Sequence, residues 1–167
     1  MLKMMDANIK LSNIGEEAGE PYGDITIHSA ELRGIDIEGD LIPRVIDEIP
    51  VLSLAASLAK GKTIIKDAGE LRVKESDRIT ATVDGLSKLG AEIKETNDGM
   101  VISGKSNLVG ASVDSFDDHR IAMTMGIAGV LSDGVTEIKR AEANMISYPG
   151  FWENLSILTN KQEDTNR

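Results

Sequence analysis

A basic segment, LRVKESDR at residues 71–78, contains the first side chains of this sequence that could do chemistry. On a helix, Lys74, Glu75 and Arg78 would share one face, because residues three or four apart are neighbours. The amino end of a helix is positive and favours acids, yet Arg72, Lys74 and Arg78 gather where we expect such an end. An anion bound among these cations would explain the arrangement. A solvated charged face with internal ion pairs is the alternative, and the segment by itself favours it.

A second segment with the same features is DDHR at residues 117–120, directly before an apolar stretch that predicts a helix. Asp117 or Asp118 can cap the start of that helix with its carboxylate. Arg120 then falls in the first turn, where the helix dipole disfavours a cation. Alone, the pattern indicates a plain helix cap with a surface arginine. Cations at two helix starts, where the helix dipole disfavours them, together favour an anion site in this acidic sequence.

The third candidate is the carboxylate of Asp47, in the segment IDEIPVL. Pro50 indicates a helix start, and Asp47 has nearly the same place relative to that helix as His119 and Arg120 have relative to theirs. An acid at such a place is most often a helix cap or a first-turn residue. A carboxylate close to cations can also accept a proton from a hydroxyl group, so proton transfer is the functional alternative.

The composition limits what these segments can do. The sequence has no cysteine, so thiolate chemistry is excluded, and its two histidines are too few and too far apart to suggest a metal site alone. A formal net charge of -10 makes nucleic acid and anionic membranes unsuitable partners. No apolar run reaches the roughly 18 residues of a membrane span, and the chain does not begin like a signal peptide. We therefore expect a cytoplasmic protein.

The elements that must position these residues occur twice. The segment ASLAKGKTIIKDAGE at residues 56–70 resembles AGVLSDGVTEIKRAE at residues 128–142, and LKMMDANIKLSN and ITIHSAELRG resemble LSKLGAEIKETN and MVISGKSNLVG. The order is preserved with a period of roughly 75 residues, which is too long for a solenoid. We expect two copies of one supersecondary unit in a pseudo-symmetric domain, with a glycine-rich insertion at residues 15–23 in the first copy.

Each copy predicts two strands, a polar loop, an apolar helix and a further strand. The expected helices cover residues 51–59, 77–89 and 121–131, and the expected strands cover residues 63–66, 92–95, 100–103 and 135–139. Gly61 and Gly134 fit the ends of the apolar helices, where glycine is common. The mixed pattern predicts an α/β or α+β fold, with one domain at residues 1–159 and a polar tail at residues 160–167.

The chain begins at a place where the repeat predicts the end of a helix. Residues 1–10 align with the last turns of the helix that we expect to end at Leu89. A helix without its beginning loses its N-cap and most of its buried face. We therefore expect the sequence to be part of a longer protein.

Four motifs, taken together, resemble one family. LRVKESDR, DEIPVLSLAASLAKGKT, DDHRIAM and NMISYPGFWENL, in their observed spacing, closely resemble the 5-enolpyruvylshikimate-3-phosphate synthases, from residue 1 to about residue 158. The resemblance implies an enolpyruvyl transferase-like fold of two similar domains facing each other across a cleft, each made of three βαβαββ units. About two units of the C-terminal domain would be present here, and the N-terminal domain would be the missing partner.

The same resemblance implies an activity and assigns roles. The family transfers the enolpyruvyl group of phosphoenolpyruvate to the 5-hydroxyl of shikimate 3-phosphate and releases phosphate, with no metal or organic cofactor. Carried over by position, Asp47 accepts the 5-hydroxyl proton, and Glu75 handles the proton on the methylene carbon of phosphoenolpyruvate. Lys74 contacts shikimate 3-phosphate. Arg78 and Arg120 hold phosphoenolpyruvate.

The resemblance also gives His119 a supporting place beside Arg120, and it includes one departure. Many members have a lysine three residues before the proline of the last motif, where this chain has Ile146, so one phosphate contact of those members has no counterpart. The family is the target of glyphosate. Because one wall of the cleft is missing, we expect the chain alone to be inactive. Two alternatives are a non-catalytic module that binds phosphorylated anions and a UDP-N-acetylglucosamine enolpyruvyl transferase, a related family that lacks the RVKESDR string.

Overall fold

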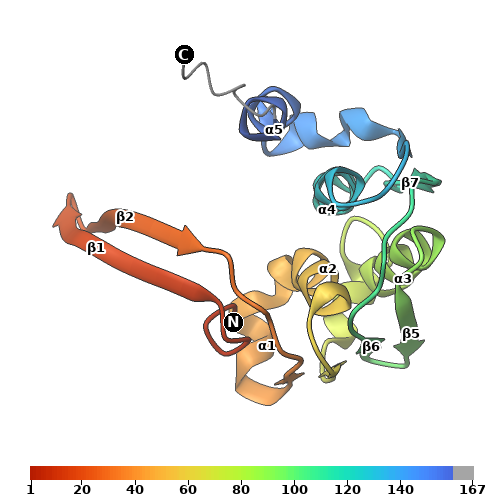
Figure 1. Cartoon of the computed structure of the whole chain (residues 1–167), viewed down its shortest axis with the longest axis horizontal. Coiled ribbons are helices and arrows are strands. Elements are labelled where there is room, and N and C mark those ends of the chain that lie inside the picture. Colours follow the sequence, from red (N-terminus) through yellow and green to blue (C-terminus); the bar gives the residue numbers. More distant parts are fainter. Residues whose placement is uncertain (160–167) are drawn as a thin grey trace, which may run out of the picture.

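The fold was obtained as a computed structural model, which describes residues 1–159 (Figure 1). The predicted tail at residues 160–167 lies outside the described residues. The elements are β1 (Asn8–Glu17), β2 (Glu20–His28), β3 (Asp36–Ile37), η1 (Gly39–Leu41), α1 (Ile42–Val45), η2 (Ile46–Glu48), α2 (Ile49–Leu58), β4 (Lys62–Ile65), η3 (Gly69–Val73), α3 (Arg78–Lys88), β5 (Glu92–Thr96), β6 (Gly99–Ser103), β7 (Ser112–Asp114), α4 (His119–Val130), β8 (Glu137–Lys139), η4 (Ala141–Ile146) and α5 (Phe151–Thr159). The predicted mixture of helices and strands is therefore confirmed.

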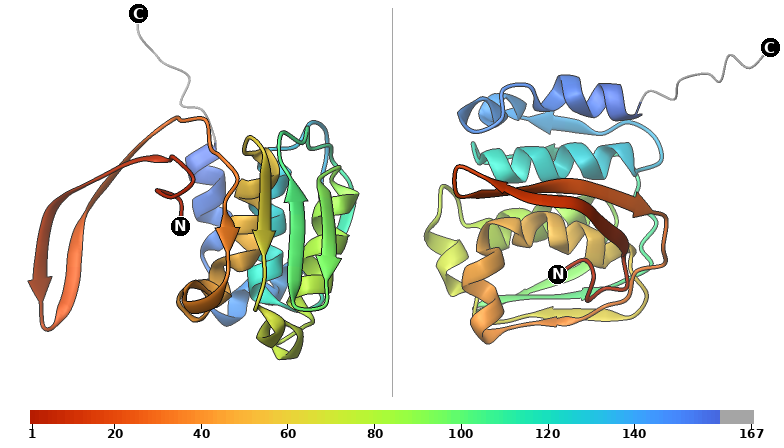
Figure 2. Two further views of the ribbon diagram at one scale, coloured as in Figure 1. Left: turned by 90° about the horizontal axis from the view of Figure 1, so that it is seen from below. Right: turned by 90° about the vertical axis from the view of Figure 1, so that its left-hand side faces the viewer.

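A four-stranded sheet and a group of packed helices form the body of the molecule. The strand order is β3-β4-β6-β5, in which β3 and β4 are parallel and the β5–β6 hairpin is antiparallel to β4. Helices α2 and α3 cover one face of this sheet and pack against α4 (Figure 2). Inward-facing residues such as Ile65, Met100 and Ile102 are fully buried. The core is aliphatic, in agreement with an aromatic content of only 3%.

The predicted repeat is confirmed by matching hydrogen bonds in the two copies. The amide of Gly34 donates to the carbonyl of Lys60 at 2.8 Å, and the amide of Gly110 donates to the carbonyl of Asp133 at 2.7 Å. Each glycine lies before the first strand of a parallel pair, β3–β4 in one copy and β7–β8 in the other. A Cβ atom at either glycine would lie 2.2 Å from a backbone oxygen of the neighbouring segment. Only glycine permits this close approach of the backbones.

The predicted helix at residues 77–89 is confirmed as α3, which Asp77 caps by accepting the Thr80 amide at 3.1 Å. Other local features differ from those considered in the sequence. The shared helical face considered for residues 71–78 does not form, because η3 ends at Val73 and Lys74 is extended. The glycine-rich insertion is the end of a long β-hairpin, β1–β2. Residues 1–6 form hydrogen-bonded turns and no regular helix.

The glycines expected at helix ends also lie elsewhere. Helices α2 and α4 end at Leu58 and Val130, so Gly61 and Gly134 are too far along the chain to be their C-caps. Both glycines have positive φ angles, +88° and +94°, and form the turn before the next strand. Their conformational freedom is therefore used in the turn instead of the helix end.

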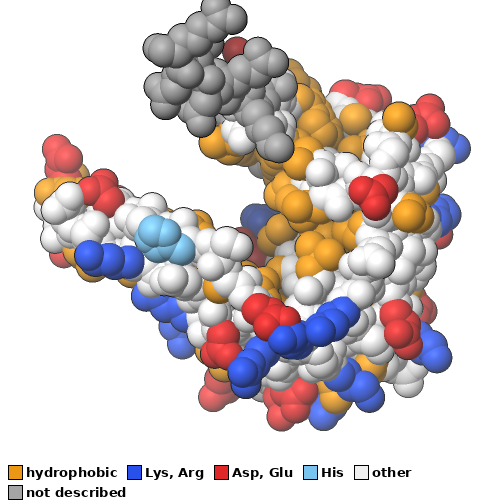
Figure 3. Space-filling model, viewed as in Figure 1, with side chains coloured by type: hydrophobic (Ala, Val, Ile, Leu, Met, Phe, Trp, Pro, Cys, Tyr) orange, Lys and Arg blue, Asp and Glu red, His pale blue; other side chains and the backbone are white. Residues whose placement is uncertain are grey.

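The hairpin β1–β2 projects from the body and has an uncovered apolar face (Figure 2). In the repeat, its residues Ile25 and Ile27 correspond to Met100 and Ile102 of β6. The pair in β6 is fully buried beneath α2 and α3, whereas Ile25 and Ile27 are 65% and 66% exposed. Figure 3 shows a hollow between the hairpin and the body, with hydrophobic side chains along the side of the body. The described residues contain no segment that covers this hairpin as the helices cover β5–β6.

The two equivalent isoleucines provide a test of this asymmetry. We expect Ile102→Ala to lower the free energy of unfolding by about 3 kcal/mol, because it creates a cavity in the core. Ile27→Ala should lower it by about 0.5 kcal/mol or less, because the side chain is already exposed. Urea unfolding followed by circular dichroism measures both values. Equal losses would show that the hairpin face is buried in solution.

Candidate functional site

The starts of three helices meet at one end of the body and bring together the residues predicted from separate motifs. Asp47 lies in η2 directly before α2, Arg78 is the first residue of α3, and Arg120 is in the first turn of α4. One carboxylate oxygen of Asp47 lies 2.9 Å from Nη1 of Arg78, and the other lies 3.3 Å from Nη2 of Arg120. Asp47 therefore joins the two arginines, as a shared site requires.

The guanidinium of Arg78 is the centre of this group. Its side chain is 1% exposed and contacts three carboxylates. Nε donates to Asp118 at 2.7 Å, Nη1 to Asp47 at 2.9 Å and Nη2 to Glu75 at 2.5 Å. Burial acts to lower the pKa of Arg78, but the hydrogen bond and the charge of Asp118 outweigh it, so the pKa is raised above its ordinary value. Arg78 is therefore a permanent cation held by acids on three sides.

Asp118 is the fully buried partner in this group and has a second task. Its Oδ1 accepts the amides of Arg120 at 2.9 Å and Ile121 at 3.4 Å, which caps α4, while its Oδ2 accepts the Ser76 hydroxyl at 3.1 Å. Burial acts to raise the pKa of Asp118, but the hydrogen bond and charge of Arg78 keep it below the usual value. The sequence predicted the cap and missed the pairing with Arg78. No local signal could reveal it, because the two residues are 40 positions apart.

Arg120 is more accessible than Arg78. Its side chain is 31% exposed, and Nη1 donates to the carbonyl of Asp47 at 3.0 Å and to Glu48 at 3.2 Å. Two arginines are thus opposed by four carboxylates: Asp47, Glu48, Glu75 and Asp118. The predicted basic clusters are therefore neutralised by acids of the chain itself. An anion that binds here must replace carboxylates that are exposed, such as Glu75, whose side chain is 46% exposed.

Two other predicted site residues lie at the edge of the group. Lys74 follows η3 in an extended conformation and pairs with Glu70. Lys74 does not share a helical face with Arg78, because the chain is extended at Lys74 between η3 and α3. His119 begins α4 and is 8% exposed, and its buried Nδ1 has no hydrogen-bond partner within residues 1–159. His119 is the chain neighbour of both Asp118 and Arg120, and its Nδ1 is available for a hydrogen bond.

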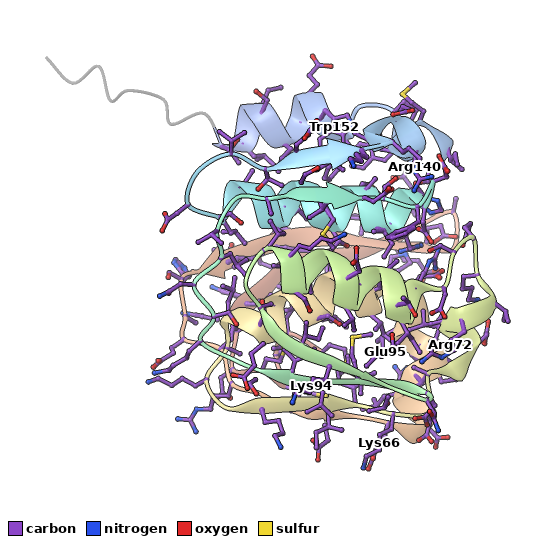
Figure 4. All side chains as sticks on the ribbon, turned by 90° about the vertical axis from the view of Figure 1, so that its right-hand side faces the viewer. Lys66, Arg72, Lys94, Glu95, Arg140 and Trp152 are labelled. Carbon is purple, nitrogen blue, oxygen red and sulfur yellow. The ribbon has the colours of Figure 1, made fainter. Side chains whose placement is uncertain are left out.

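Arg72, which the sequence placed among the anion-binding cations, has a structural role. It donates to the carbonyls of Thr96 at 2.6 Å and Asn97 at 2.8 Å, and to Asp77 at 2.8 Å. It also lies 3.8 Å from Glu95, and Figure 4 shows the two side chains next to each other. Arg72 ties the segment before α3 to the β5–β6 turn. That segment carries Glu75 and is thereby fixed.

An apolar hollow of about 200 Å³ adjoins Asp47 and Arg120 of the site. Its other lining residues come from η2, α2, α4, α5 and the turn before α5: Glu48, Val51, Met123, Thr124, Ile127, Tyr148 and Phe151. Ile146, the residue at the position of the family lysine, is 71% exposed in η4. Within the described part of the chain, no group of three acidic or histidine residues is arranged to hold a metal ion, and no helix is long and apolar enough to cross a membrane.

Comparison with protein families gives a match over almost the whole chain. The family described as EPSP synthase (3-phosphoshikimate 1-carboxyvinyltransferase) matches residues 1–155. A 3-phosphoshikimate 1-carboxyvinyltransferase of Roseiflexus sp. (strain RS-1) is 56% identical over 151 residues, which are 90% of this chain and 35% of the relative. The protein of the same name in Bacillus cereus (strain AH187) is 54% identical over 95% of this chain and 37% of its own length. The chain thus spans little more than a third of these relatives.

Solved structures agree with the sequence comparison. An EPSP synthase from Acinetobacter baumannii matches 95% of this chain and 37% of its own, with a TM-score of 0.88 and 39% identity. The enolpyruvyl transferase NikO from Streptomyces tendae matches 94% of this chain and 33% of its own, with a TM-score of 0.68 and 18% identity. The second likeness concerns the fold alone. The predicted enolpyruvyl transferase-like fold is confirmed.

The buried pair of Arg78 and Asp118 leads to a stability prediction. We expect Asp118→Asn to lower the free energy of unfolding by about 3 kcal/mol, because it leaves the buried guanidinium without its fully buried counter-charge. The matched control is Asp84→Asn, which removes an exposed pair with Lys88 and should cost about 0.5 kcal/mol or less. Urea unfolding at pH 7 measures both. A loss for Asp118→Asn no larger than the control would contradict the central role of this pair.

The same pair predicts a dependence on pH. The folded pKa of Asp118 is lowered, so its stabilising contribution is present above the unfolded pKa of about 3.9 and is lost as the pH falls through the folded value. Asp118→Asn removes this part of the dependence. Melting temperatures measured from pH 7 to pH 2 should therefore fall less steeply at the acid end for the variant than for the wild type. Parallel curves would count against a charged Asp118.

Proposed function

Because the chain belongs to the EPSP synthase family of 3-phosphoshikimate 1-carboxyvinyltransferases, we propose that it forms one wall of an active site that transfers the enolpyruvyl group of phosphoenolpyruvate to the 5-hydroxyl of shikimate 3-phosphate. The single observation that carries the proposal is the meeting of Arg78 and Arg120 on Asp47 at the starts of three helices. Arginine forks suit the paired oxygens of carboxylate and phosphate.

Binding of phosphoenolpyruvate proceeds by exchange of ion pairs. Asp118 keeps hold of Nε of Arg78, while the outer nitrogens of the guanidinium pass from Asp47 and Glu75 to the anion. Arg120 exchanges its contacts with Asp47 for the same ligand. The exchange has two effects. It places the anion between two arginines, and it frees two carboxylates for proton transfer beside the reacting carbons.

The freed carboxylates then have separate tasks. Asp47 accepts the proton of the 5-hydroxyl as the hydroxyl oxygen adds to C2 of phosphoenolpyruvate. Glu75, which takes up a proton from water once it leaves Arg78, gives that proton to C3. The tetrahedral intermediate loses phosphate, and Glu75 takes a proton back from C3, which restores the double bond. Lys74 leaves Glu70 to contact shikimate 3-phosphate. His119 supports Arg120 from the same turn, and Ile146 supplies no charge to the phosphate.

The rest of the active site comes from polypeptide beyond this segment. The chain spans 35–37% of its relatives, and its hairpin β1–β2 exposes residues whose counterparts are buried in the other repeat. A further repeat unit covers that hairpin, and the N-terminal domain faces Asp47 and Arg120 across the cleft. We expect no turnover from the 167 residues alone, because one cleft wall is not enough to enclose both substrates.

Ligand binding tests the site directly. In amide-resolved NMR titrations, phosphoenolpyruvate with shikimate 3-phosphate should shift the signals of Lys74, Arg78 and Arg120. Arg120→Gln should weaken binding about tenfold, or about 1.4 kcal/mol, because a bidentate charged contact is lost. The matched control is Arg33→Gln, which changes an exposed pair with Asp6 and should leave binding unchanged. No shifts with either ligand would refute the site. Shifts with UDP-N-acetylglucosamine in place of shikimate 3-phosphate would favour the related transferase.

Activity tests the proposal of an incomplete site. Phosphate release from the two substrates should be absent with this chain alone and should appear when the complementary N-terminal portion of the Bacillus cereus relative is added. Full turnover by the chain alone would contradict the need for a second wall. Binding without turnover in the mixture would favour a non-catalytic module for phosphorylated anions.

A further inference from the structure

The loop that leads into α4 contains backbone conformations that side chains normally avoid. Phe116 and Asp117 both have positive φ angles, 55° and 57°, and neither is a glycine. Left-handed backbone carries a steric cost for residues with a Cβ atom, and two such residues in succession persist only when their surroundings hold them firmly. The next residue is Asp118, which caps α4 and pairs with Arg78. The strained loop therefore sets the position of a central site residue.

Two short side chains fix this loop from within. Asp114 accepts the amide of Phe116 at 2.8 Å, and the hydroxyl of Ser115 accepts the amide of Asp117 at 3.2 Å. The amide of Asp118 donates to the carbonyl of Ser115 at 3.0 Å. These bonds define the path of the loop. They also depend on Asp114 and Ser115 being held in place.

Arg140 holds the loop from the other strand of the parallel pair. It follows β8, itself has a φ angle of 56°, and donates through Nε and Nη2 to Asp114 at 2.9 and 2.5 Å. Its Nη1 lies 3.3 Å from Asp117, and its guanidinium lies 5.7 Å from the centre of the Phe116 ring. Its carbonyl accepts the hydroxyl of Ser115 at 2.9 Å. One residue thus contacts every residue of the loop from 114 to 117, and Figure 4 shows it beside η4.

The equivalent loop of the first repeat is held by different contacts. Asp67 has the place of Arg140 in the repeat, two residues after the end of β4, and also has a positive φ angle. Its carboxylate accepts the amide of Gly39 at 2.9 Å. Gly39 is the residue with positive φ in that loop, and a glycine adopts this conformation without steric cost. The contacts of Arg140 with the loop at residues 114–117, called the Arg140 clasp below, therefore occur in the repeat whose loop carries side chains in the strained conformation.

The electrostatic surroundings of Arg140 are consistent with a fixed clasp. Acids that face it are Asp114, Asp117 and Glu142. The hydrogen bond to Asp114 raises the pKa of Arg140 above its ordinary value. Burial acts to raise the pKa of Asp114, but the Phe116 amide and Arg140 keep it below the usual value. The pair is therefore charged throughout the neutral range.

We propose that Arg140 is a positioning residue of the active site, which acts through the loop at residues 114–117 to fix Asp118 and Arg120. It touches no reacting atom. Its guanidinium holds two residues in left-handed backbone, and their path sets where α4 begins. The start of α4 then decides where Asp118 meets Arg78 and where Arg120 faces the ligand. The catalytic meaning of this role rests on the proposed function, whereas the mechanical role does not.

Hydrogen exchange of two amides measures the mechanical role without any ligand. Asp118 accepts the amides of Arg120 and Ile121, so their exchange reports how well the start of α4 is held. We expect Arg140→Met to speed their exchange at least tenfold, with no such change in α2 or α3. Arg140→Lys keeps the positive charge but loses the paired N–H donors of the guanidinium, so its exchange rates should lie between those of the wild type and of Arg140→Met. Arg33→Met, the matched control at another exposed arginine pair, should change neither amide.

A second change separates positioning from general stability. Asp117→Gly removes the steric cost of the left-handed conformation, so we expect it to restore slow exchange in the Arg140→Met background. Phosphoenolpyruvate binding should weaken about tenfold in Arg140→Met and recover in the double variant. Three results would each overturn the proposal. The first is unchanged amide exchange in Arg140→Met, the second is equal acceleration of exchange throughout α2, α3 and α4, and the third is no recovery of slow exchange with Asp117→Gly. If the exchange results hold while the wild type binds no phosphoenolpyruvate, the clasp stands and the proposed function fails.

Discussion

The buried charge of Arg78 is the constraint on which the rest of the site depends. A guanidinium that is 1% exposed is stable only if counter-charges reach it inside the fold. Asp118 does so from the cap of α4, and Asp47 does so from the turn before α2. The starts of three helices from both repeats are therefore held at one point. Because Asp118 also caps α4, its loss would disturb both the pair and the helix.

This constraint also explains why cations lie at helix starts, where the dipole disfavours them. In the unliganded chain, four carboxylates surround two arginines, so the local charge is negative and the cations are satisfied. Under the proposed function, a ligand anion enters by replacing carboxylates and not by filling an empty positive pocket. The carboxylates around Arg78 differ in how easily they can be replaced. Asp118 is fully buried and fixed, whereas Asp47 and Glu75 are more than 40% exposed and can move.

The sequence predicted what depends on periodicity and spacing, and it missed what depends on distant pairing. The repeat, the apolar helices and the meeting of Asp47, Arg78 and Arg120 followed from patterns that recur at fixed intervals. The roles of Arg72 and Arg140 did not, because each binds partners more than 20 positions away or in a loop without periodicity. The helical face considered for residues 71–78 does not form for a related reason. The shape of this segment is decided by the cap at Asp77 and by tertiary contacts, which outweigh local spacing.

The chain has two surfaces of different character, the exposed apolar face of the hairpin β1–β2 and the charged group at the starts of α2, α3 and α4. In the second repeat, the inner residues of β5–β6 are buried by helices, and in the first repeat their counterparts in β1–β2 are exposed. Contiguous exposed apolar surface of this kind marks an interface, and its burial contributes roughly 25 cal/mol per Å² to association. The site itself offers charge and little apolar area. The two surfaces therefore differ in what they offer, because the hairpin face provides apolar area for association and the helix starts provide charged groups.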